Sequence, residues 1–219
     1  MKLDARKLGR RVLWAGLVLF LLGGSFEIAN YSWYRTRTWR VVNVPVTLAE
    51  GQVDSQEFRV NINENFVILL EVDRQIPIEI AENVLGIQDP GSERRSEPHG
   101  FKLKWIVFED GKVLKSGVSD GSGEGYWSRK EGRALGFFPG KRGHRYRVVM
   151  DILEDGGALQ PYHPYLKVEV DLFALDGYAI SEALYEFAGF VICMGGLVLV
   201  AASIGLWAWV VSRKRPQDA

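Results

Sequence analysis

The sequence predicts a membrane protein in which two transmembrane helices, one N-terminal and one C-terminal, flank an extracytoplasmic all-β sandwich of the jelly-roll or immunoglobulin-like type. Three observations predict this class: apolar runs near both ends of the 219-residue chain, alternating apolar residues between them, and turn-forming residues that separate the alternating segments. The chain carries 27 basic and 27 acidic residues, and this neutral balance gives no support for binding to nucleic acid.

The strongest membrane signal lies near the C-terminus, where residues 187–212 contain no charged side chain. This run exceeds the roughly 20 residues that a helix needs to cross the hydrocarbon core. Trp207 and Trp209 lie near its end, and basic residues follow at 213–215, which is typical of a membrane interface on the cytoplasmic side. We therefore expect a transmembrane helix over residues 181–212 and a cytoplasmic tail over residues 213–219.

The N-terminal segment admits two interpretations. Residues 12–26 are uncharged and follow five basic residues, which suits either a cleavable signal peptide or a retained helix. The small residues at 23–25 form a weak cleavage site, and aromatic residues cluster at 31–34, where the outer interface of the bilayer would fall. A retained anchor over residues 12–34, after a basic cytoplasmic tail over residues 1–11, is the interpretation that we favour.

The distribution of basic residues predicts the orientation. Five precede the first helix and three follow the second, which places both termini in the cytoplasm. Arg35, Arg37 and Arg40 weaken this bias without reversing it, because long translocated domains are largely exempt from the rule. We therefore expect a cell (inner) membrane protein whose domain at 35–180 lies in the periplasm or outside the cell.

The middle of the chain has the period-two pattern of strands with one buried face. Apolar residues alternate with mostly polar ones over residues 42–48, 58–62, 101–107, 146–152 and 166–172. Turn signals separate these segments, and no strong helical periodicity interrupts them. The single cysteine, Cys193, falls in the second helix, so no intrachain disulfide is available and the domain must be stabilised by burial of its core.

The segment DGSGEGYWSRKE, residues 120–131, has the spacing of a calcium-binding loop. Its candidate oxygen ligands are Asp120, Ser122, Glu124 and Glu131. A calcium-binding EF-hand needs a helix on each side, whereas both flanks here are strand-like. We therefore predict a glycine-rich connection between strands, with calcium as the weaker alternative, and no bound metal or cofactor.

Aromatic residues provide the candidates for ligand binding. The segment QPYHPYL contributes Tyr162, His163 and Tyr165, and Tyr126 and Trp127 lie in the glycine-rich segment. Together they could form a platform for a glycan or a peptide; the alternative is that the rings simply pack on the domain. The three histidines fall in no metalloprotease or nucleophile motif, so the sequence does not indicate an enzyme.

The two apolar helices carry small residues at intervals of seven. These are Gly16 and Gly23 in the first helix and Gly189, Gly196 and Ser203 in the second. Ala201 and Gly205 add a second small pair. Such strips let helix backbones approach closely in a membrane, although glycine is common in these helices and the spacing could arise by chance. Glu27 is the one charged residue expected near the bilayer edge, where a carboxylate is costly unless it is paired or reaches the interface.

Three functions are consistent with these features. The first, which we favour, is a non-enzymatic accessory or assembly subunit that docks on other membrane-protein subunits through its helices and on a further periplasmic component through its sandwich. The second is a membrane-anchored module that binds a glycan or a peptide. The third is an envelope hydrolase whose site the sequence does not mark.

Overall fold

The computed structural model describes residues 5–73, 76–85, 101–119, 125–127 and 130–212. The chain forms two compact units, a helical unit built from Met1–Thr36 and Asp176–Ala219 and a β unit built from Arg37–Leu175. This division separates the apolar ends from the middle of the chain, as the sequence predicts.

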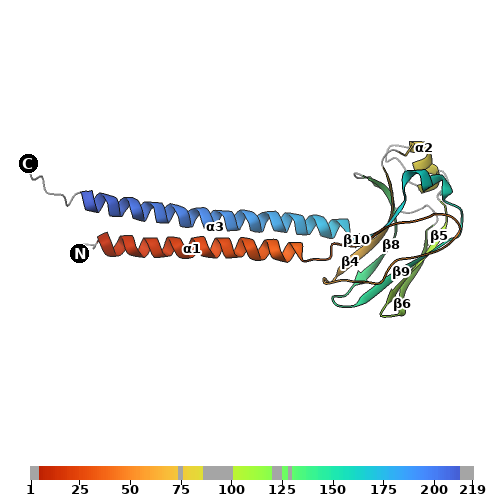
Figure 1. Ribbon diagram of the computed structural model, residues 1–219, viewed down its shortest axis with the longest axis horizontal. Coiled ribbons are helices and arrows are strands. Elements are labelled where there is room, and N and C mark those ends of the chain that lie inside the picture. Colours follow the sequence, from red (N-terminus) through yellow and green to blue (C-terminus); the bar gives the residue numbers. More distant parts are fainter. Residues whose placement is uncertain (1–4, 74–75, 86–100, 120–124, 128–129, 213–219) are drawn as a thin grey trace, which may run out of the picture. The chain divides into compact units, whose positions relative to one another are not determined.

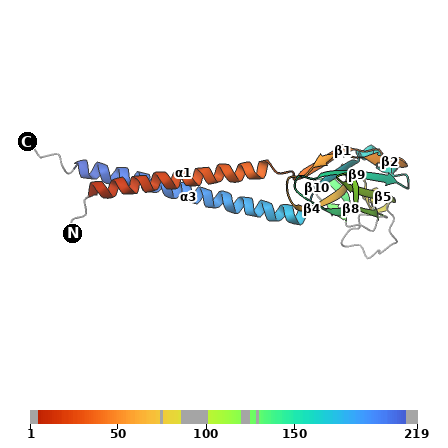
Figure 2. The same ribbon diagram turned by 90° about the horizontal axis from the view of Figure 1, so that it is seen from below.

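Two long helices form the helical unit. α1 (Ala5–Arg35) and α3 (Leu172–Ser212) run side by side in opposite directions (Figures 1 and 2). At 1.5 Å per residue they are about 46 and 61 Å long, and each exceeds the roughly 30 Å of a hydrocarbon core. By length and composition, Lys7–Arg35 and Phe173–Ser212 are both long and apolar enough to cross a membrane.

Both helices extend beyond the predicted membrane segments. α1 begins inside the segment 1–11 that we expected to be a tail, and α3 begins at Leu172 rather than at residue 181. Leu172 continues the period-two pattern of the preceding strand, so the pattern alone could not show where the strand ends. Asp171 supplies the physical stop: it is a favourable residue before a helix, and its carbonyl oxygen accepts the first helical hydrogen bond, from the Leu175 N–H at 2.9 Å.

The β unit consists of two antiparallel sheets (Figure 1). One sheet has the order β1-β10-β4-β8-β7, and the other has the order β2-β9-β5-β6 with β3 also paired to β9. The strands are β1 (Arg40–Pro45), β2 (Gly51–Asp54), β3 (Phe58–Arg59), β4 (Glu64–Asp73), β5 (Leu103–Glu109), β6 (Lys112–Ser119), β7 (Gly125–Trp127), β8 (Lys130–Gly140), β9 (Arg145–Ile152) and β10 (Tyr165–Val170).

The strand pairs are nested. β1 pairs with β10, β2 and β3 pair with β9, β4 pairs with β8, and β5 pairs with β6. The first strand thus pairs with the last, and the pairing continues inward to the hairpin of β5 and β6. This is the strand order of a jelly roll rather than of an immunoglobulin-like sandwich. Within the described part of the chain, three short helices connect the strands: α2 (Ile78–Ile80), the π-helix η1 (Ala81–Leu85) and the 3₁₀ helix η2 (Gly157–Tyr162).

The core lies between the sheets and contains the residues that the alternation predicts. Leu103, Val107, Val148 and Met150 are fully buried in it. Trp105 lies against two glycines, Gly117 on the adjacent strand β6 and Gly136 on β8 of the other sheet, because a Cβ on Gly117 would come within 2.6 Å of its ring and a Cβ on Gly136 would overlap it. The absence of side chains at these two positions makes room for the indole.

Some strand predictions were wrong in extent. β3 ends at Arg59 although Val60 and Ile62 are buried, and β1 ends at Pro45 although Val46 and Leu48 are buried. These residues point into the core from irregular backbone, so burial alone produced the alternation. The alternation did not predict β4, because its residues 66–72 are buried on both faces of the sheet and therefore do not alternate.

Candidate functional site

The small residues of the two helices face each other. A Cβ added to Gly16 would lie 2.8 Å from the Gly196 carbonyl oxygen and 3.0 Å from the Leu199 Cβ. A Cβ added to Gly23 would lie 2.9 Å from the Gly189 carbonyl oxygen and 2.7 Å from the Cys193 Sγ. The backbones approach closely at both levels, which is what a seven-residue spacing of small residues permits.

Not every predicted small residue takes part in this contact. Ser203 is buried, and its hydroxyl donates to the Val200 carbonyl oxygen at 2.8 Å. Ala201 is exposed, and a Cβ on Gly205 would meet no atom within 4 Å. These two residues lie on another face of α3, so the second small pair is not part of the contact between α1 and α3 and stays a prediction for packing with other helices.

Glu27 is positioned by the same contact. A Cβ on Gly189 would come within 2.7 Å of its Cγ and 2.8 Å of its Oε1. The carboxylate side chain therefore lies over the notch that Gly189 leaves in α3, one turn beyond Gly23 on α1. The structure accordingly places the one predicted intramembrane acid inside the helix pair.

An aromatic groove opens between α1 and α3 near the first residues of α3. It has a volume of about 550 Å³, and its lining residues are Phe26, Ala29, Asn30, Trp33, Tyr178, Ser181, Glu182 and Tyr185. The rings of Phe26 and Tyr185 meet edge to face with centroids 5.8 Å apart, and those of Trp33 and Tyr178 meet at the same distance. Sequence reasoning identified Trp33, within the aromatic cluster at 31–34, but missed Phe26 and the aromatic residues of α3. The reason is that these rings find their partners only when the helices pair.

A second groove opens at the other end of the helix pair. It has a volume of about 770 Å³ and is lined by residues that include Arg10, Leu13, Ser203 and Trp207. Arg10 and Trp207 belong to the basic and aromatic residues that suggested a cytoplasmic interface in the sequence. Both grooves described here therefore belong to the helical unit.

The β unit contains a buried cluster of charged side chains. The Lys167 Nζ lies 2.7 Å from a Glu71 carboxylate oxygen and 2.8 Å from one of Glu169, and Arg40 reaches Glu169 at 3.3 Å. Burial works to lower the pKa of Lys167, but the hydrogen bonds that its ammonium donates to Glu169 and Glu71 outweigh this effect and the pKa is raised. The ammonium group is therefore held charged, and the cluster ties β10 to β4 and, through Arg40, to β1.

Two histidines pair with acids, which sequence inspection did not predict. His144 Nδ1 lies 2.7 Å from Asp110 Oδ2, and His163 Nδ1 lies 3.0 Å from Asp73 Oδ2. Both pairs are exposed, and neither lines either of the two grooves described above. Beside the first pair, Glu109 accepts a hydrogen bond from the Tyr146 hydroxyl at 2.9 Å and binds Lys141 at 3.2 Å. These contacts join the turn at Asp110 to the start of β9.

The predicted aromatic platform is only partly described. Tyr162 packs against the core, whereas His163 is exposed and caps η2 in a left-handed conformation at φ 48°. Tyr165 on β10 pairs with Glu71 on β4, and Glu71 pairs with Gly132 on β8. Gly132 in turn pairs with Tyr126 on β7. Tyr126 and Tyr165 thus lie in one row across the sheet. Trp127, also on β7, is in register with Glu131.

Most of the calcium candidate lies outside the described residues, which include neither Asp120, Ser122 nor Glu124. Glu131 is buried within β8, opposite Val72 on β4. No group of three or more His, Cys, Asp or Glu side chains able to hold a metal ion occurs among the residues whose placement is described.

Comparisons with known proteins give weak likenesses only. No protein-family model matches the sequence, and no curated protein matches it. Among solved structures, a protein from Sulfurospirillum deleyianum is 11% identical over 60% of this chain and 98% of its own, with a TM-score of 0.43. Rabbit GITRL (8% identity, 61% and 94% coverage, TM-score 0.25) and murine APRIL (13%, 60% and 98%, TM-score 0.26) are less similar. At these scores we derive neither fold nor function from them.

Proposed function

We propose that the chain is a non-enzymatic accessory or assembly subunit of a membrane complex. The helix pair would anchor it in the cell membrane with both termini in the cytoplasm, and the jelly roll would contact a further component in the periplasm or outside the cell. The observation that carries the proposal is the apolar outer surface of the helix pair.

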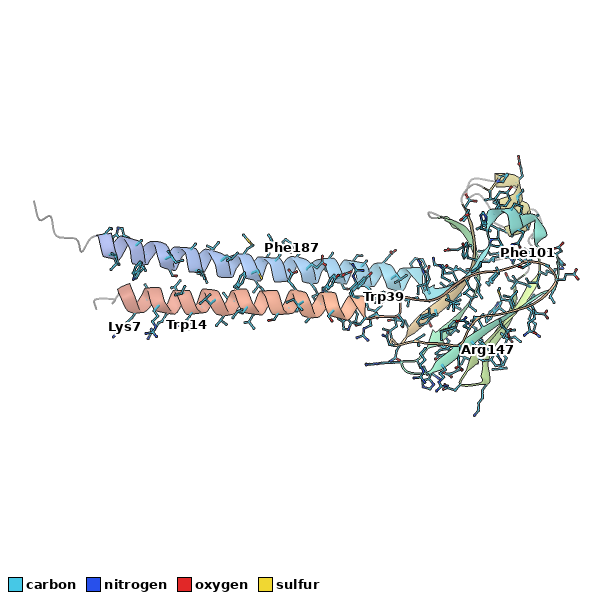
Figure 3. All side chains as sticks on the ribbon, in the orientation of Figure 1. Lys7, Trp14, Trp39, Phe101, Arg147 and Phe187 are labelled. Atoms are coloured by element: carbon cyan, nitrogen blue, oxygen red, sulfur yellow. The ribbon has the colours of Figure 1, made fainter. Side chains whose placement is uncertain are left out.

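That surface is extensive and faces away from the helix contact. Leu21 is 64% exposed and Phe187 is 67% exposed. Figure 3 shows Trp14 and Phe187 on the outer sides of their helices. Large apolar side chains exposed over two helices of this length require lipid or other membrane helices around them.

The small-residue strips contribute to the proposal by packing the two helices on each other. Gly16, Gly23, Gly189 and Gly196 are used within the helix pair itself. A partner helix would therefore contact the outer aliphatic faces, and the glycines would act indirectly by fixing how α1 and α3 present those faces.

Topology and partner recovery test the proposal together. Reporter fusions after Lys2 and after Asp218 should read cytoplasmic, and an insertion near Ser92 should read extracytoplasmic. The full chain, purified from native membranes in mild detergent, should bring other membrane proteins with it. A mature chain that begins near residue 26, or a chain that purifies alone in several detergents, would overturn the proposal.

Glycan or peptide binding is a second candidate, because Tyr126 and Tyr165 lie in one row of the sheet. Soluble glycans or peptides should then bind the full chain and lose affinity in Tyr165→Ala. An unchanged affinity would remove this candidate. The exposed histidine–acid pairs line neither of the two grooves described above, so no observation here favours the hydrolase alternative over the other two.

A further inference from the structure

We propose that the aromatic groove between Phe26–Tyr185 and Trp33–Tyr178 binds the headgroup of a zwitterionic phospholipid, with the lipid ammonium near Glu182 and a phosphate or ester oxygen near Asn30. The inference rests on the proposed membrane anchoring and adds a ligand to it. It is carried by the shape of the groove, by the polar groups that line it and by its depth along the helices.

The two ring pairs close the ends of the groove. Phe26 and Tyr185 meet at one end. Trp33 and Tyr178 meet at the other end, seven residues later on α1 and seven residues earlier on α3. Seven residues correspond to about 10 Å of helix, which leaves room between the pairs for a headgroup. Aromatic faces attract cations, and quaternary or primary ammonium groups are bound by cages of such rings.

The polar groups in the groove suit a ligand that carries both a positive and a negative group. Glu182 supplies a carboxylate, which suits a cation. The buried Nδ2 of Asn30 has no hydrogen-bond partner, and an unsatisfied buried donor favours a ligand that brings an acceptor oxygen. A zwitterionic lipid carries both groups within one headgroup.

A basic residue, Arg35, lies near the groove. Arg35 follows the groove residue Trp33 by two positions on α1, and its guanidinium lies 5.2 Å from the ring centroid of Tyr31. A lone cation in the groove would be repelled by Arg35. A headgroup with a phosphate beside its ammonium would instead place a negative charge near the guanidinium.

The depth of the groove fits a headgroup. Arg10 lines the other groove and Asn30 lines this one, and both lie on α1. Twenty residues of helix separate them, or about 30 Å, which is the thickness of a hydrocarbon core. If Arg10 lies at one interface, Asn30 lies at the opposite one.

The test is native mass spectrometry of the full chain released from detergent micelles, with phosphatidylethanolamine and phosphatidylglycerol of identical acyl chains as probes. The wild type should bind phosphatidylethanolamine about tenfold more tightly, since a desolvated cation–π contact is worth roughly that factor. Glu182→Gln should abolish the preference. Asp176→Asn, which removes an acid on the same helix that does not line the groove, should keep it.

Equal binding of the two lipids by the wild type, or an unchanged preference in Glu182→Gln, would overturn the inference. A second copy of the chain in place of lipid would overturn it as well. Extraction of membranes with alkaline carbonate, applied to each variant, separates this outcome from the proposed function. A chain that stays in the membrane without lipid preference refutes only the headgroup site, whereas a chain that is washed out refutes both proposals.

Discussion

Gly16 and Gly196 lie in mutual backbone contact. A Cβ on Gly16 would stand 2.8 Å from the Gly196 carbonyl oxygen, and a Cβ on Gly196 would stand 2.7 Å from the Gly16 carbonyl oxygen. Because neither atom could be accommodated without moving backbone, this contact depends on the absence of a side chain at both positions. The helix pair should therefore be sensitive to side-chain size at this position.

Gly196→Leu should separate the helices without reducing their hydrophobicity. The native Cys193 reports this separation, because it is the only cysteine of the chain and its thiol lies 3.5 Å from the Phe20 carbonyl oxygen. In micelles we expect alkylation of Cys193 by a maleimide to become several-fold faster in the variant.

Gly195→Leu is the matched control, since a Cβ on the adjacent Gly195 would meet nothing within 4 Å. Its labelling rate should equal that of the wild type. Equal rates in all three proteins would show that the contact does not hold the helices together.

Glu27 and Gly189 should be coupled energetically. Gly189→Ala would place a methyl group 2.7 Å from the Glu27 Cγ, so the side chain must move out of its notch. We expect a lower melting temperature in micelles and a smaller loss when the same change is made in Glu27→Ala. Residues in contact typically couple by about 0.5–3 kcal/mol. Strictly additive effects of the two changes would contradict the placement of Glu27.

Lys167→Met should destabilise the jelly roll strongly. The change leaves Glu71 and Glu169 buried without the ammonium group that bonds both, and breaking a buried ion pair costs about 3–5 kcal/mol. Adding Glu71→Gln and Glu169→Gln should recover part of this loss. Urea unfolding followed by near-ultraviolet circular dichroism measures the free energy of unfolding.

An exposed ion pair provides the comparison for Lys167. Lys102 and Glu154 lie 3.4 Å apart with both side chains about half exposed. Lys102→Met should change the free energy of unfolding by less than about 1 kcal/mol. A similar loss in both lysine variants would mean that burial of the Lys167 cluster adds nothing.

Tyr146 should make the jelly roll lose stability at alkaline pH. Burial and the hydrogen bond to Glu109 raise the pKa of Tyr146 to about 12, although the hydrogen bond from the Lys141 N–H opposes this. A raised pKa means that the fold favours the neutral phenol. The contribution is complete below the unfolded pKa of about 10 and is lost as the pH rises from there towards 12.

Tyr146→Phe tests this dependence, because phenylalanine keeps the ring and removes the titrating hydroxyl. Urea midpoints measured between pH 8 and pH 11.5 should fall more steeply for the wild type than for the variant. Parallel curves would show that other groups account for the alkaline loss.

Much of the candidate site could be predicted one helix at a time. The glycines at 16, 23, 189 and 196 were identified from their spacing, and the structure places them in one contact. Ala201 and Gly205 have an equally good spacing but lie elsewhere, because a small-residue repeat identifies a narrow face without showing which face the partner helix covers. The aromatic residues of α3 that line the groove, Tyr178 and Tyr185, had no signal of their own.

The sequence by itself determined the two apolar helices and the strand-rich middle, because hydrophobic length and period-two alternation are local properties of the chain. Only the tertiary structure decided the nested strand order, since the pairing of β1 with β10 joins residues more than a hundred positions apart. The same holds for the Glu71–Lys167 pair and for the aromatic groove. Each depends on side chains from distant segments that no local pattern relates, and packing alone brings them together.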